Sequence, residues 1–162
     1  MTPGRAQQRT PWRPAARTVA VVLHRRARGI AAAQVRRDAS RLLRRLRTDA
    51  ELCVTLVGDG EMRRLNATYR GTDRPTDVLA FAAREGKPAP MVDQLLGDVV
   101  ISLDTAARQA SARGVTLAAE VRLLLTHGIL HLLGYDHERS PGEARRMFRK
   151  QRELIRTLDG EE

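Results

Sequence analysis

Cysteine is almost absent from this 162-residue chain, which contains only Cys53. A single cysteine excludes an intramolecular disulfide and any metal site built from several cysteines, and it favours a reducing, cytoplasmic compartment. The sequence also lacks a run of about 18 apolar residues, the length that a membrane-spanning helix needs, so we expect no membrane partner. Its basic N-terminus has no apolar segment of the kind that a secretory signal requires.

Acidic residues are scarce in the first 50 positions, where Asp38 and Asp49 stand against 13 arginines and the charge balance is +11. Residues 51–162 hold 16 basic and 17 acidic residues, a balance of −1. The net charge of +10 therefore belongs to the first third of the chain. Such asymmetry indicates a polyanionic partner, most often nucleic acid, although high genomic GC content also enriches arginine.

Histidine is rare as well, yet three of the four histidines lie between positions 127 and 137. Apolar residues at helical spacing predict a helix over 117–133, and His127 and His131 share one face of it because positions four apart are neighbours. Gly134 then ends the helix and lets the chain turn back with His137. Three neutral imidazoles with one open coordination position predict a catalytic metal site, and zinc, one ion per chain, is the first candidate.

The H-x3-H-x5-H spacing is also that of metzincin peptidases, whose motif begins H-E-x-x-H. Here Gly128 stands where those enzymes carry the glutamate that activates water, which argues against a peptidase. The string H-G-x-L-H-L-x-G-Y-D-H, from His127 to His137, instead resembles the YbeY family, metal-dependent endoribonucleases of bacterial rRNA maturation. The resemblance extends to N-x-x-Y-R-x-x-D-x-P-T-D-V-L, which begins at Asn66, and to the L-G-D segment at 96–98. The chain departs from the family in Ala80-Phe81-Ala82, usually Ser-Phe-Pro, and in its long basic N-terminal arm.

Apolar periodicity and turn residues predict an α/β fold: a single domain with a small mixed sheet of about four strands packed against about five helices. We expect strands over 18–23, 51–57, 78–82 and 95–102. We expect helices over 30–47, 60–69, from 104 to before Gly114, over 117–133 and from 141 to about 158, with Asp59 and Asp104 as N-caps. Residues 1–17 are expected to form a disordered basic arm and 84–94 an exposed loop, while 18–160 form the YbeY-like metallo-endoribonuclease domain.

Arginines are the candidates for contact with RNA. Arg70 suits a scissile phosphate because a guanidinium binds two phosphate oxygens and stays charged, although an ordinary cation at a helix end is the alternative. The resemblance favours the functional role and implies Arg70 and His127 as catalytic residues. Exposed arginines of the expected helix 30–47 are either a solvated face or contacts for RNA phosphates: Arg37, Arg41 and Arg44. Asp136 and Glu138 flank His137 and could orient an imidazole.

The resemblance implies a single-strand-specific, zinc-dependent endoribonuclease that matures the 3′ end of small-subunit rRNA and takes part in ribosome quality control. It implies rRNA and the small ribosomal subunit as partners, with ribosomal proteins or an Era-type GTPase as further candidates. Two alternatives stay open. One is a metallopeptidase-like hydrolase, and the other is a non-catalytic ribosome assembly factor whose zinc is structural.

Overall fold

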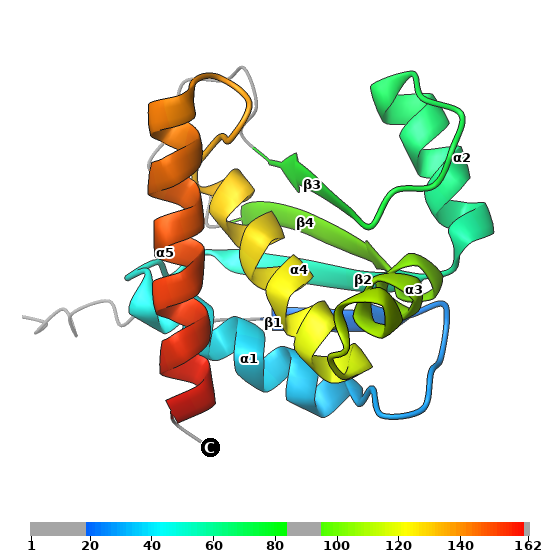
Figure 1. The fold of residues 1–162 in the computed structure, drawn as a ribbon, viewed down its shortest axis with the longest axis horizontal. Coiled ribbons are helices and arrows are strands. Elements are labelled where there is room, and N and C mark those ends of the chain that lie inside the picture. Colours follow the sequence, from blue (N-terminus) through cyan, green and yellow to red (C-terminus); the bar gives the residue numbers. More distant parts are fainter. Residues whose placement is uncertain (1–18, 84–94, 161–162) are drawn as a thin grey trace, which may run out of the picture.

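The computed structural model describes residues 19–83 and 95–160 (Figure 1). Within these ranges the chain forms, in order, β1 (Val19–Leu23), α1 (Ala32–Arg45), β2 (Glu51–Val57), α2 (Asp59–Arg70), β3 (Val78–Ala82), β4 (Leu95–Ser102), α3 (Leu103–Arg113), α4 (Leu117–Leu132) and α5 (Pro141–Gly160). The predicted α/β class, with four strands and five helices in these ranges, is confirmed. The arm expected at 1–17 and the loop expected at 84–94 lie outside the described residues.

The four strands form one mixed sheet in the order β1-β2-β4-β3. β1 pairs with β2 and β2 with β4 in parallel, whereas β3 pairs antiparallel with β4 at the edge. The parallel neighbours are joined through helices, as parallel strands require. β3 therefore forms one edge of the sheet, and α4 packs against it.

Helices α1, α4 and α5 lie on one face of the sheet (Figure 1), and α2 packs on part of the other face. Val99 and Ile101 of β4 belong to the main core, which includes buried residues of α1, α4 and α5. Val100 points to the other face and packs with Met62 of α2 in a smaller core, because successive strand residues face opposite sides. α2 thus lies across the sheet from α4, near the strand β3 that both helices approach.

Among the helices of the described ranges, the one with two of the histidines has the most buried residues. Its buried apolar side chains include Val121, Leu124, Leu125, Ile129 and Leu130. Burial of each large aliphatic side chain contributes on the order of 1.5–3 kcal/mol, so α4 is held rigidly against the sheet. In the described part of the chain no single helix has the length and apolarity to cross a membrane; α3 and α4 meet that requirement only together, as a pair bent by 115°.

The prediction of Asp59 and Asp104 as the N-caps of α2 and α3 was wrong, and each aspartate instead accepts a hydrogen bond from the start of the other helix. Gly58 is the N-cap of α2, and Ser102 caps α3 by accepting a hydrogen bond from Thr105 N. Asp104 Oδ2 accepts from the backbone N–H of Asp59 at 2.9 Å, while Asp59 Oδ1 accepts from Ser102 Oγ at 2.8 Å. β4 runs directly into α3, which brings the two helix starts together in a way that local sequence does not reveal.

Candidate metal centre and active-site cleft

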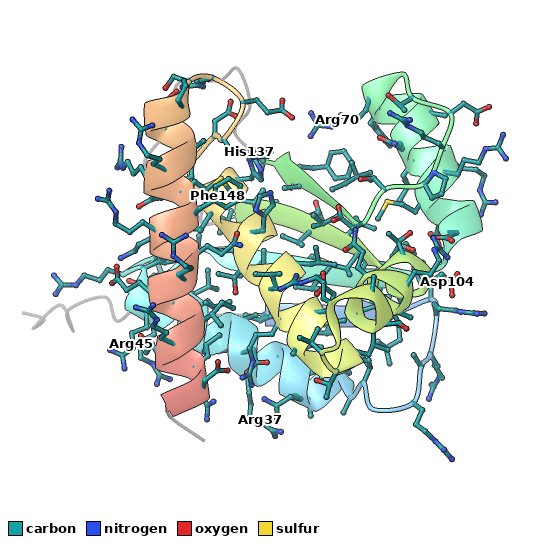
Figure 2. The ribbon with its side chains drawn as sticks, viewed as in Figure 1. Arg37, Arg45, Arg70, Asp104, His137 and Phe148 are labelled. Atoms are coloured by element: carbon teal, nitrogen blue, oxygen red, sulfur yellow. The ribbon has the colours of Figure 1, made fainter. Side chains whose placement is uncertain are left out.

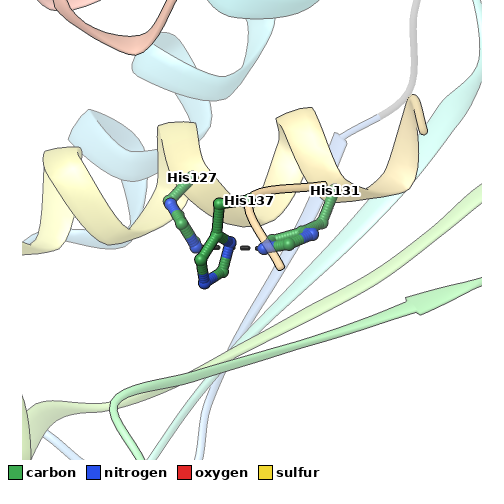
Figure 3. A group of neighbouring side chains, drawn as sticks. All are labelled: His127, His131 and His137. Atoms are coloured by element: carbon green, nitrogen blue, oxygen red, sulfur yellow. Dashed lines mark hydrogen bonds between the residues drawn. The ribbon is translucent and has the colours of Figure 1, made fainter. Parts of the chain in front are cut away.

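The three histidines that the sequence singled out lie together at the C-terminal end of α4 (Figure 3). Gly134 has a φ of +94°, a left-handed conformation that glycine adopts without strain, and its N–H donates to His131 O at 3.0 Å. The chain turns there and returns His137 to the helix. One ring nitrogen from each of His127, His131 and His137 lies within 4.8 Å of the others, so the group could hold a metal ion.

The hydrogen bonds around the rings leave nitrogen lone pairs directed at one another. His127 Nδ1 donates to Gln151 Oε1 at 2.9 Å, and the His131 ring is hydrogen-bonded to the backbone of Tyr135. The two Nε2 atoms of His127 and His131 then face each other at 3.0 Å. His137 Nδ1 is buried with no hydrogen-bond partner among the described residues. A cation between these nitrogens would satisfy all three, because neutral imidazoles bind metal through a bare nitrogen.

The surroundings of His127 and His131 favour the neutral form of each imidazole. Burial lowers the pKa of His127, and its hydrogen bond to Gln151 opposes that effect only in part. Burial also lowers the pKa of His131, with further lowering by the neighbouring rings of His127 and His137. Neutral rings are the form that a metal ion requires of its ligands.

Gly128, between the two helical histidines, lies where α4 touches the sheet. A Cβ atom at this position would approach Val99 Cγ1 to 2.7 Å and Val78 Cγ2 to 3.3 Å. The absence of a side chain therefore allows α4 to lie close to β3 and β4. It also means that the glutamate of the peptidase motif has no room in this packing.

α5 supplies two contacts to the histidines that the sequence analysis missed. The Phe148 ring lies 6.3 Å from that of His127, in a stacked orientation, and 5.8 Å from that of His137. Gln151, one turn further along, binds His127 as described above. Neither residue carries a local signal in the sequence, because only the packing of α5 against α4 brings it to the site.

The histidines line one wall of an open cleft of about 720 Å³, and Arg70 lies on its other side (Figure 2). Arg70 Nη2 donates to Ala80 O at 2.9 Å, and its guanidinium lies 5.7 Å from the centroid of the Phe81 ring. The acceptor is a backbone carbonyl, so the family difference at Ala80 leaves this contact intact. The cleft thus brings Arg70 and the three histidines together.

The candidate RNA-binding arginines of α1 lie outside the cleft. Arg37 and Arg44 are exposed and Arg41 is half-buried, and none of the three is among the described residues that line the cleft. Arg37 donates to Gln34 Oε1 on the same helix at 2.7 Å. Figure 2 shows Arg37 well away from His137. Any RNA contact by α1 would therefore involve nucleotides outside the cleft.

The acidic neighbours of His137 do not orient the rings as strongly as Gln151 does. Asp136 Oδ1 accepts from the backbone N–H of Glu138 at 2.8 Å, which stabilises the turn. Glu138 is largely exposed and its Oε1 lies 3.9 Å from His137 Nε2. Asp77, which also lines the cleft, accepts from Val78 N and from Gln109 Nε2.

Comparison with known proteins places the chain in a family. The family model described as Endoribonuclease YbeY matches residues 23–159. A protein named endoribonuclease YbeY from Geobacter metallireducens is 46% identical over 145 residues, which cover 88% of this chain and 97% of that protein. One of the same name from an Anaeromyxobacter species is 51% identical over 133 residues, covering 82% and 67%.

A solved structure shares the fold as well. The solution structure of TM1509 from Thermotoga maritima superimposes with a TM-score of 0.64 and 28% identity, over 89% of this chain and 91% of that one. The family match of residues 23–159 includes Arg70 of α2, the three histidines on and after α4, and Gln151 of α5. The chain therefore belongs to the YbeY family.

Proposed function

We propose that this chain is a metal-dependent endoribonuclease that hydrolyses phosphodiester bonds of single-stranded RNA, in the 3′-end maturation of small-subunit rRNA and in ribosome quality control. The observation that carries the proposal is the presence of a three-histidine cluster and Arg70 on facing sides of one open cleft. Membership of the YbeY family supports it, because the relatives are named as endoribonucleases.

His127, His131 and His137 fit one zinc ion, since three imidazole nitrogens are a common donor set for catalytic zinc. When bound, such an ion supplies a Lewis acid and a water with a pKa near 7, a nucleophile at neutral pH. Gln151 holds the His127 ring in the tautomer with a bare Nε2. Phe148 packs beside the rings of His127 and His137 on the side of α5.

Arg70 is the residue that would neutralise charge on the phosphate in the transition state. Its bond to Ala80 O and its contact with Phe81 hold the guanidinium at the cleft wall. Only one of its five N–H groups is used by that bond, so the others remain for phosphate oxygens. A donor held in place before the reaction stabilises developing charge without reorganisation.

The polyanionic partner is supported by a stripe of arginines on α5. These exposed residues recur at spacings of four, three and four positions, which places them on one face of the helix: Arg145, Arg149, Arg152 and Arg156. No hydrogen bond or ion pair is found for these four side chains within the described ranges. α5 packs against α1, so the stripe and the α1 residues Arg37, Arg41 and Arg44 would together contact RNA phosphates outside the cleft.

The wider setting follows from this activity. We propose that the enzyme acts in the cytoplasm on the small ribosomal subunit, and that ribosomal proteins or an Era-type GTPase bring it to its substrate. A peptidase is disfavoured by the packing at Gly128. A non-catalytic assembly factor remains the competing role, and it requires the same rRNA partner without cleavage.

One experiment separates these roles. Pure protein is incubated with labelled rRNA and, in parallel, with casein, each with and without a chelator. We expect cleavage of the RNA alone, abolished by the chelator, and one zinc per chain by elemental analysis. His127→Ala, His131→Ala and His137→Ala should each lose zinc and cleavage. RNA that is bound but never cut would favour the assembly factor, and cut casein would favour the peptidase.

A further inference from the structure

A second groove, of about 430 Å³, lies beside the histidine cluster between α3, α4 and α5. It shares Asp77, Val78 and His127 with the cleft, so the two hollows meet at the metal centre. The groove is therefore within reach of any RNA strand whose phosphate lies at the histidines. The activity proposed above uses His127 and Gln151 from its lining and gives the rest of the groove no role.

The groove contains a buried carboxylate with one free oxygen. Glu120 is only 2% exposed and lines the groove, and its Oε2 accepts from Arg113 Nη1 at 2.9 Å. No hydrogen-bond donor is found for Glu120 Oε1 within the described residues, and this oxygen is not completely buried. It therefore stays open to a donor on a ligand that enters the groove.

The rest of the lining suits a flat ligand with a polar edge. Leu123, Leu124 and Val78 supply apolar surface, and two glutamines supply free polar groups. Gln109 uses its Nε2 on Asp77 and Gln151 uses its Oε1 on His127, which leaves the other amide atom of each available. An apolar surface bordered by a few polar groups is typical of small-ligand sites.

The charges disfavour a phosphate here, because two carboxylates stand against the single cation Arg113. The carboxylates of Glu120 and Asp77 both border the groove, and each would repel an anion. A nucleobase carries no such charge, can lie with its face on apolar side chains and presents donors and acceptors at its edge. The groove therefore fits the part of a nucleotide that the metal centre does not hold.

We propose that this groove binds the base of a nucleotide next to the scissile phosphate, with Glu120 and Arg113 reading its edge. The inference rests on RNA being the substrate of the adjacent cleft. Because Glu120 Oε1 is an acceptor, it favours a base with an exocyclic amino group over uracil, whereas Arg113 donates to a neighbouring ring nitrogen or carbonyl. Glu120 and Arg113 are binding residues in this role and take no part in bond breaking.

The test compares two short RNAs whose bases are nearly identical in size. Cytidine and uridine pentanucleotides differ at the edge of the pyrimidine ring, where cytosine carries an amino group and uracil a carbonyl. Binding is measured by fluorescence anisotropy on metal-free protein, so that neither RNA is cut. We expect the cytidine pentamer to bind about tenfold more tightly, the ratio that one hydrogen bond to a charged group provides.

Substitutions assign that ratio to the groove. Glu120→Gln should bring the two affinities together, because an amide can serve either base edge. Arg113→Gln should weaken binding of both pentamers. Addition of either pentamer to the wild type should shift the backbone amide NMR signals of groove residues in α3 and α4. The matched control is Arg63→Gln, because Arg63 is 57% exposed with one ion pair, close to the 53% of Arg113, and does not line the groove.

Thermal melting of each variant guards against misfolding. If Glu120→Gln does not fold, Arg113→Gln decides, since its side chain is half exposed. Equal affinities of the wild type for both pentamers, or pentamer-induced NMR shifts confined to the cleft, would overturn the proposal. A protein that binds the pentamers as expected but never cuts rRNA would leave the groove in place and contradict the endoribonuclease activity instead.

Discussion

Gln151 Oε1 lies 2.9 Å from His127 Nδ1, so a residue 24 positions further along the chain fixes which nitrogen of this imidazole is bare. The bond joins α5 to the helix that carries two of the candidate metal ligands. It would act on a bound metal ion through the ring, as outer contacts of ligating histidines commonly do.

Replacing Gln151 should change metal affinity without touching a ligand. Gln151→Leu removes the acceptor, and we expect about 10–100-fold weaker zinc binding in competition with a chromophoric chelator. Gln151→Glu keeps the acceptor and adds negative charge, so zinc should bind at least as tightly as in the wild type. Gln109→Leu makes the same change at a residue that does not contact a histidine, and it should leave zinc affinity unaltered. Wild-type affinity in Gln151→Leu would show that the bond does not control the site.

Replacing Arg70 should separate catalysis from metal binding. We expect Arg70→Ala to keep its zinc and nearly its melting temperature, because the side chain is exposed, but to lose about 10²–10³ in single-turnover cleavage of saturating RNA. Arg70→Lys should recover only part, since an ammonium lacks the two-pronged geometry. Arg63→Ala, on the same helix but outside the cleft, is the control. Near wild-type cleavage by Arg70→Ala would remove Arg70 from the mechanism.

The histidine cluster should make the metal-free protein less stable in mild acid. The folded-state pKa values of His127 and His131 are lowered, so the unfolded chain takes up protons first as the pH falls. Stability is then complete above the unfolded pKa of about 6.5 and is lost as the pH falls from there towards the folded values. Urea unfolding with a chelator at pH 7.5 and 5.5 measures the loss. In a His127→Asn, His131→Asn double variant the loss should shrink, and an undiminished loss would assign it to other groups.

Salt dependence should reveal which arginines contact RNA outside the cleft. Each contact with a single-stranded phosphate adds about 0.7 units to the slope of log affinity against log salt concentration. Arg149→Gln with Arg152→Gln should therefore lower the slope by about 1.4 units, with the fold intact because both side chains are exposed. Arg37→Gln with Arg44→Gln makes the equivalent change on α1. A helix whose double variant leaves the slope unchanged does not belong to the RNA-binding surface.

Local spacing was enough to predict the histidine cluster. His127 and His131 are one helical turn apart, and Gly134 marks the turn that returns His137, so all the necessary signals lie within a short stretch. The periodicity of single elements likewise predicted their boundaries closely. The largest shifts are two residues, as at α1, expected over 30–47 and observed as Ala32–Arg45.

Contacts between distant segments were beyond the reach of the sequence. Phe148 and Gln151 look like ordinary positions of an amphipathic helix until α5 is packed against α4. Asp59 and Asp104 both look like N-caps of their own helices. Only the junction of β4 with α3 shows that each aspartate accepts a hydrogen bond from the start of the other helix. The burial of Glu120 in a groove beside the metal centre depends on the same long-range packing.

The contact between Gly128 and Val99 also bears on the history of this site. A glycine codon of the form GGA or GGG becomes a glutamate codon by a single nucleotide change, and that change would complete the peptidase motif around the same histidine spacing. A Cβ at 2.7 Å from Val99 Cγ1 means that the new residue would push α4 off the sheet before it could act on water. The two hydrolase motifs thus differ here by one nucleotide change, but the packing of α4 against the sheet does not accommodate the resulting side chain. A glutamate at position 128 would therefore require changes at Val99 and Val78 in the neighbouring strands as well.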